Sequence, residues 1–69
     1  MDVPADMIEK LLKADPDKRF STPEIRNALN LSLGACCNAL KILRDRKIVC
    51  WESDGRGHIY WYNQHQREY

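Results

Sequence analysis

Apolar and polar positions near the start of the chain alternate with the period of a helix. Over about 5–14, apolar residues recur at i, i+1, i+4 and i+5, which is one helical face. These residues are Met7, Ile8, Leu11 and Leu12. Pro16 removes a backbone donor and disfavours helix at the residue before it. The pattern therefore predicts an amphipathic helix that ends ahead of Pro16.

A second, shorter helix is predicted over about 23–30. Ser21 and Glu24 have the spacing of a capping box, and Pro23 suits the first turn of a helix. Its apolar positions fall at i, i+3 and i+4. Between this helix and the first, residues 18–21 are expected to form a short extended link with a single strand pair.

A third helix is predicted to follow almost at once, over about 33–46, with Ser32 as its cap. Apolar residues recur here at i, i+3, i+4 and i+7, the spacing of a buried stripe. They are Cys36, Ala39, Leu40 and Leu43.

After Lys47 the pattern changes from helix to strand. The runs 48–52 and 58–62 are rich in β-branched and aromatic residues, and 53–57 between them supplies turn residues. We therefore predict a β-hairpin over about 48–62. One alternate set of its side chains is expected to close the core and the other to cover the outer face of the sheet. The polar tail 63–69 is expected to fray.

The predicted order is helix, short link, short helix, tight turn, longer helix and β-hairpin, which is an α+β fold. A length of 69 residues allows one domain, expected over 1–69. Two helices joined by a turn of a few residues form a helix-turn-helix unit.

At this point the chain resembles the winged helix-turn-helix family, across roughly residues 5–63. The segments that carry the resemblance are 20–25 leading the second helix, 29–32 at the turn, Leu40-x-x-Leu43 on the third helix, 46–49 entering the hairpin and 55–60 leaving its tip. The sequence is most similar to the small single-domain transcriptional regulators of bacteria and archaea.

The resemblance implies sequence-specific binding to double-stranded DNA. In this family the third helix, the recognition helix, enters the major groove, and the hairpin, the wing, contacts the backbone or the minor groove. The implied fold is a three-helix winged helix-turn-helix with a C-terminal hairpin wing. Lys47 stands where the family often has Gly, so we expect a less favourable residue to close the recognition helix.

Five residues of the recognition helix are candidates for DNA contact. Asn38 and Lys41 lie opposite the apolar stripe, where Asn can pair with adenine and Lys with guanine or a phosphate. Gly34 and Ala35 would let the backbone approach the groove closely. Cys37 lies on the flank of the same face.

Five further candidates would contact the DNA backbone or the minor groove. Thr22 and Ser32 stand at helix N-termini, where free N–H groups and the helix dipole favour phosphate. Arg44 is better placed for the backbone than for base edges. Arg56 and His58 belong to the wing and could reach the minor groove or its phosphates.

Charge along the chain is uneven although the net charge is only +1. Residues 1–17 carry five acids against two lysines, a net charge of −3, whereas residues 18–69 carry nine Lys or Arg against five acids, a net charge of +4. An acidic start and a basic remainder suggest that the basic side meets a polyanion.

The three cysteines do not form a disulfide framework, since their number is odd and no C-x-x-C spacing occurs. A zinc site from Cys36, Cys37, Cys50 and His58 is conceivable. However, neighbours on a helix point about 100° apart, so Cys36 and Cys37 could hardly reach one metal. We therefore expect no metal, with one buried and one exposed structural thiol. A redox role for Cys37 stays open.

An enzyme is not expected, because the sequence has no Gly-rich phosphate loop and no Cys–His pair of known spacing. No cofactor or small-molecule ligand is indicated. No run approaches the roughly 18 apolar residues that span a bilayer, and no signal peptide is evident, so a cytoplasmic location is expected. The alternative to DNA binding is a winged helix that serves as a protein–protein interaction module. A homodimer or a protein partner is compatible with both functions.

Overall fold

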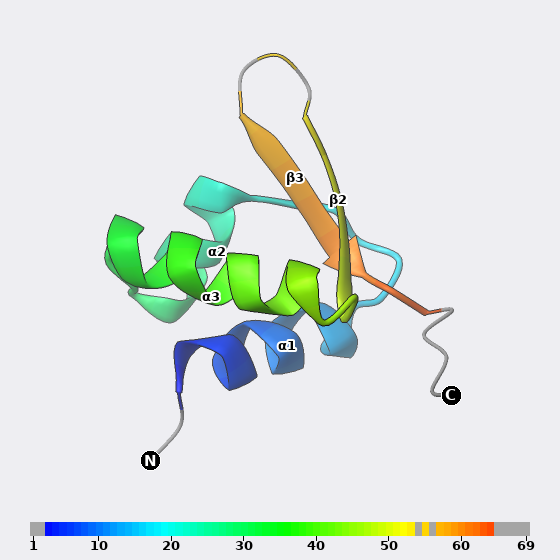
Figure 1. The fold of residues 1–69 in the computed structure, drawn as a ribbon, viewed down its shortest axis with the longest axis horizontal. Coiled ribbons are helices and arrows are strands. Elements are labelled where there is room, and N and C mark those ends of the chain that lie inside the picture. Colours follow the sequence, from blue (N-terminus) through cyan, green and yellow to red (C-terminus); the bar gives the residue numbers. More distant parts are fainter. Residues whose placement is uncertain (1–2, 54, 56, 65–69) are drawn as a thin grey trace.

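The computed structural model describes residues 3–53, 55 and 57–64. Helices and strands follow the predicted order and make an α+β fold (Figure 1). In chain order they are α1 (Pro4–Ala14), β1 (Phe20–Ser21), α2 (Thr22–Leu29), α3 (Leu33–Asp45), β2 (Val49–Ser53) and β3 (His58–Tyr62). Among the described residues, none of the helices has the length and apolar character needed to cross a bilayer.

Both predicted helix caps are confirmed. The Ser21 hydroxyl accepts from the backbone N–H of Glu24 at 3.3 Å, and the Glu24 carboxylate accepts from the backbone N–H of Ser21 at 3.2 Å. The Ser32 hydroxyl accepts from the backbone N–H of Ala35 at 3.2 Å. Two local polar signals therefore determine where α2 and α3 begin.

Helices α2 and α3 both end on a residue with positive φ that is not glycine. Asn30 closes α2 at φ 55° and Lys47 follows α3 at φ 61°. At the end of α3 the backbone N–H of Lys47 donates to the Arg44 carbonyl at 3.0 Å. The backbone N–H of Ile48 donates to the Leu43 carbonyl at 2.9 Å. This is a complete Schellman motif, closed by lysine as the sequence led us to expect.

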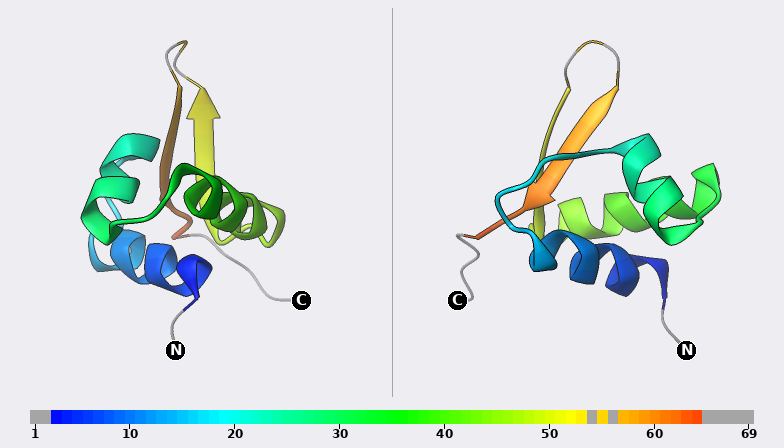
Figure 2. Two further views of the ribbon diagram at one scale, coloured as in Figure 1. Left: turned by 90° about the vertical axis from the view of Figure 1, so that its left-hand side faces the viewer. Right: turned by 180° about the vertical axis from the view of Figure 1, so that it is seen from behind.

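The sheet has three antiparallel strands in the order β1-β3-β2. The hairpin strands β2 and β3 pair with Trp51 opposite Tyr60 and Cys50 opposite Trp61. Strand β1 adds to the other edge of β3, with Phe20 opposite Tyr60. The predicted link before the second helix thus contains the expected strand pair. Figure 2 shows the hairpin rising from the three helices packed at its base.

The core lies between the helices and the base of the sheet. The predicted apolar stripe of α3 is fully buried, and α1 contributes Ile8 and Leu12. The complete set of buried apolar residues is Ile8, Leu12, Phe20, Ile25, Cys36, Ala39, Leu40, Leu43, Val49 and Tyr60. Alternate residues of the hairpin therefore close the core, as predicted.

The start of the polar tail is held in place, which corrects the expectation that the tail frays from Asn63 onward. The Asn63 side-chain amide donates to the Lys47 carbonyl at 2.9 Å. The Gln64 amide donates to the Pro16 carbonyl at 3.2 Å and to the Asp17 carboxylate at 2.9 Å. Strand β3 ends beside the turn after α3, which contains Lys47, and beside the loop after α1, which contains Pro16 and Asp17. The two amides therefore reach acceptors that are remote in sequence. Residues 65–69 lie outside the described part of the chain.

Candidate nucleic-acid interface

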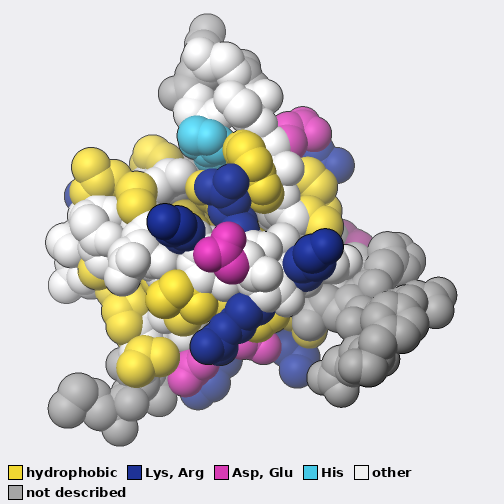
Figure 3. Space-filling model, viewed as in Figure 1, with side chains coloured by type: hydrophobic (Ala, Val, Ile, Leu, Met, Phe, Trp, Pro, Cys, Tyr) yellow, Lys and Arg dark blue, Asp and Glu magenta, His cyan; other side chains and the backbone are white. Residues whose placement is uncertain are grey.

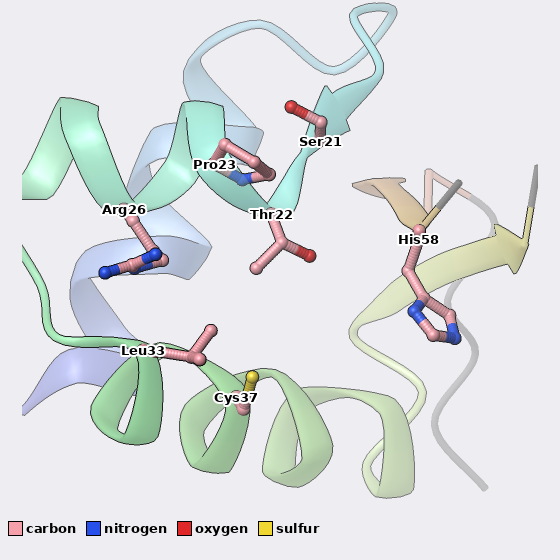
Figure 4. A pocket seen from close by; sticks show the side chains of 8 residues that line it. Ser21, Thr22, Pro23, Arg26, Leu33, Cys37 and His58 are labelled. Atoms are coloured by element: carbon pink, nitrogen blue, oxygen red, sulfur yellow. The ribbon is translucent and has the colours of Figure 1, made fainter.

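A groove of about 450 Å³ opens where the starts of α2 and α3 meet the wing. Figure 4 shows Leu33 and Cys37 projecting from α3 toward Thr22, with His58 of β3 across from them. The groove is lined by Ser21, Thr22, Pro23, Arg26, Leu33, Cys37, Gly57 and His58. The fold thus brings three of the candidate residues, Thr22, Cys37 and His58, to one depression.

The other candidates on α3 spread around its exposed side. Asn38 borders a separate cavity of about 350 Å³ between α3 and the start of α1, away from the wing. Lys41 and Gly34 are exposed, and a Cβ atom at Gly34 would meet nothing within 4 Å. Ala35 is half-buried.

Of two further candidates outside α3, Ser32 is described by the structure and Arg56 is not. Ser32 is exposed, and its hydroxyl is occupied as the cap of α3. Arg56 lies outside the described residues.

Arg44 has a contact that the sequence did not indicate. Its guanidinium carbon lies 3.7 Å from the centre of the Trp51 ring, which makes a cation–π contact between α3 and β2. The Trp51 ring in turn lies 5.2 Å from the ring of His58 on β3. This series, called here the Arg44 stack, consists of Arg44, Trp51 and His58. It ties α3 to the β2–β3 hairpin.

Tyr60 lies directly opposite Trp51 in the sheet, and the centre of its ring is 6.3 Å from that of His58. Burial raises the pKa of its hydroxyl, while the nearby charge of Arg44 and hydrogen bonds with Thr22 and Arg44 oppose that rise. Tyr60 therefore stays protonated and links the start of α2 to α3 and to the sheet.

Basic side chains gather on the outer face of α3, as Figure 3 shows from the front. They come from the second half of the helix and the turn after it. The residues are Lys41, Arg44, Arg46 and Lys47, with the single acid Asp45 among them. By contrast, Lys18 and Arg19 pair with Glu24 and Glu52 at 3.7 and 3.5 Å. Positive charge thus lies along α3 beyond the groove, since Lys41 follows Cys37 by one helical turn. Arg44 stacks on Trp51, whereas Arg46 borders the cavity on the α1 side.

The cysteines separate by burial as predicted. Cys36 is buried, Cys37 is exposed and Cys50 is half-buried. Burial raises the pKa of the Cys36 thiol, so this residue remains a neutral core group. Within the described residues, no three His, Cys, Asp or Glu side chains are grouped so as to hold a metal ion.

Several residues at or beside the site were not predicted from the sequence, among them Arg26, Leu33 and Trp51. Arg26 follows Thr22 by four residues and so shares its helical face, a spacing that could have indicated it. Leu33 is 55% exposed because it precedes the part of α3 that packs on α1. The place of Trp51 against α3 had no local signal, since it depends on how the hairpin docks.

Comparison with solved structures shows that this is the winged helix-turn-helix fold. The chain is similar to the DNA recognition and protein interaction domains of HOP2, at 19% identity and a TM-score of 0.81, over 87% of this chain and 98% of that one. It is similar to the ferric uptake regulator of Francisella tularensis with iron, at 19% identity and a TM-score of 0.82, over 97% of this chain and 55% of that one.

A third similar structure is the adhesin competence repressor AdcR of Streptococcus pyogenes. Its TM-score is 0.70 at 19% identity, over 93% of this chain and 47% of that one. The chain thus spans about half the length of both regulators and nearly all of the HOP2 structure. No protein-family model matches the sequence, and no curated protein matches it significantly.

Proposed function

We propose that this protein binds double-stranded DNA in a sequence-specific manner and acts as a small transcriptional regulator. The observation that carries the proposal is the groove at which the starts of α2 and α3 meet the wing, with the basic side chains of Lys41 and Arg44 following along α3. A duplex presents phosphates on both sides of its major groove, so a basic helix flanked by two further elements suits it. The similarity to a DNA recognition domain and to two regulators supports the same function.

In the proposed complex α3 lies in the major groove and the wing contacts the backbone or the minor groove. Lys41 and Asn38 reach base edges or phosphates from the exposed side of α3, where Gly34 and Ala35 let the backbone approach. Cys37 lies on the flank nearest the wing.

The remaining proposed contacts surround the recognition helix. Thr22 and Ser32 meet phosphates at the starts of α2 and α3. Arg56 and His58 act from the wing. Arg44 adds positive charge to the surface, while its stacking on Trp51 also holds the wing against α3.

Fluorescence anisotropy with a generic duplex at two salt concentrations tests the proposal. We expect affinity to fall steeply with salt, with a slope of about 0.9 per phosphate neutralised. Lys41→Ala should weaken binding further and reduce that slope. Lys13→Ala is the matched control, because it removes the same charge from α1. Absence of binding at low salt would refute DNA binding.

A second surface favours the alternative, a module that binds a protein partner or a second copy of the chain. Val3 and Ile42 are 53% and 37% exposed, and both border the cavity between α1 and α3. Sedimentation equilibrium of wild type and Ile42→Asp tests self-association. A monomer at all concentrations in both proteins would leave only a heterologous partner for this surface.

A further inference from the structure

The first two turns of α3 contain a pair of neighbouring apolar side chains that face the groove. Leu33 and Cys37 are four residues apart, so they lie side by side on the helix, and both border the groove (Figure 4). Leu33 is 55% exposed, which leaves much of a large aliphatic side chain in contact with water. The buried core of the protein therefore does not account for leucine at this position.

The same segment lacks hydrogen-bonding side chains. From 33 to 37 the residues are Leu, Gly, Ala, Cys and Cys, and Cys36 is turned into the core. A Cβ atom at Gly34 would meet nothing within 4 Å, so packing within the protein does not require glycine there. Asn38, the first amide in the helix, is exposed but does not line the groove; it borders the cavity between α3 and the start of α1.

The occupant of this surface is indicated by the charge around it. Arg26 lines the groove, and Lys41 is one helical turn beyond Cys37. Leu33 and Cys37 lie among these basic side chains, so the surface is complementary to a polyanion that also carries apolar groups. In the major groove of DNA such a group exists on one base, because thymine alone carries a C5-methyl group.

We propose that Leu33 and Cys37 determine base preference by packing against thymine methyl groups in the major groove. This inference rests on the proposed function and adds its specificity. In helix-turn-helix complexes the N-terminal residues of the recognition helix are those that contact base edges. The first part of α3 thus recognises methyl groups, while Lys41 in the second part contributes charge.

The decisive experiment compares two polymers, poly(dA-dT) and poly(dA-dU), in the anisotropy assay. The duplexes have the same charge and the same hydrogen-bonding edges, and differ in the methyl group. Burial of one methyl group corresponds to about a fourfold gain in affinity. We therefore expect wild type to prefer the thymine polymer by at least that factor.

Three variants assign the preference to its residues. Leu33→Ala, at an exposed helical position, should bring the ratio of the two affinities close to one. Cys37→Ser should reduce that ratio partially. Lys41→Ala should weaken binding to both polymers by the same factor and leave the ratio unchanged. Circular dichroism confirms that each variant is folded.

The outcomes separate this inference from the function on which it rests. Binding to both polymers with equal affinity would overturn the methyl contact and leave DNA binding intact. A preference that persists unchanged in Leu33→Ala would overturn the assignment to Leu33. Failure to bind either polymer at low salt would reject the proposed function, and the inference with it.

Discussion

The two faces of the β2–β3 hairpin carry the same kind of contact in different surroundings. On the inner face, Arg44 of α3 lies 3.7 Å from the centre of the Trp51 ring. On the outer face, Arg19 lies 4.2 Å from the centre of the Trp61 ring and pairs with Glu52 at 3.5 Å. The inner contact joins the hairpin to α3, whereas the outer one joins it to the segment before β1.

The difference follows from strand parity. Trp51 is directly opposite Tyr60, so the two share a face, and Trp61, one residue on from Tyr60, points to the other side. Both tryptophans attract an arginine, since a guanidinium favours an aromatic face wherever it is found. Only the inner pair lies at the proposed DNA surface. Similar chemistry is thus expected to affect binding on one face and mainly stability on the other.

Removing an aromatic residue from each face of the hairpin should give the largest difference in the free energy of unfolding. Tyr60 is 5% exposed in the core, so Tyr60→Ala should lower the free energy of unfolding by about 3–5 kcal/mol. Trp61→Ala removes a half-buried ring and should cost about 1 kcal/mol. Urea denaturation followed by circular dichroism measures both. Equal losses would show that the outer face is as much a part of the core as the inner one.

Removing each arginine should separate binding from stability. Arg44→Ala is expected to weaken duplex DNA binding about tenfold, equivalent to about 1.4 kcal/mol, because the wing loses its hold on α3. Arg19→Ala should change affinity by less than about twofold, since its charge is already paired with Glu52. Anisotropy measures both affinities.

Arg44→Lys distinguishes stacking from charge in that experiment. It retains the positive charge and loses the planar group that covers Trp51. We expect it to bind almost as weakly as Arg44→Ala. Full affinity in Arg44→Lys would mean that charge alone accounts for the contribution of Arg44.

Substitution of Lys47, at the junction between α3 and β2, should stabilise the whole protein and so does not distinguish the two faces of the hairpin. Lys47 has φ 61°, a conformation that costs a residue other than glycine about 1–2 kcal/mol. Because glycine loses more backbone entropy on folding, Lys47→Gly should stabilise the protein by a net amount of about 0.5–1 kcal/mol. Lys47→Ala removes the same charge and keeps the strain, so it should not be stabilising. Thermal unfolding compares the two.

The smallest effect is expected from the ion pair on the outer face. The side chains of Arg19 and Glu52 are each 54% exposed, so Glu52→Gln should cost no more than about 0.5 kcal/mol. The loss should vanish in about 1 M salt, where the screening length falls to about 3 Å. A loss that persists in urea denaturation at high salt would indicate a hydrogen bond rather than charge as its source.

Local sequence was sufficient to predict the helices and strands and most of the buried core residues. Capping residues at Ser21 and Ser32 and the apolar stripe of α3 act within a few residues, so their effects can be predicted without tertiary contacts. The strand parity that buries Val49 and Tyr60 also follows from alternation within a short run. For the same reason the order of elements was enough to indicate the winged helix-turn-helix fold.

Only tertiary structure decided which candidate residues meet. The groove joins Thr22, Cys37 and His58, which are remote in sequence, whereas the exposed Asn38 borders a different cavity. The stacking of Arg44 on Trp51 and the anchoring of Gln64 likewise depend on how the hairpin docks against the helices. Local patterns specify which face of each element is apolar. The angle at which those faces pack comes from the summed fit of many side chains, and no short segment of sequence contains that information.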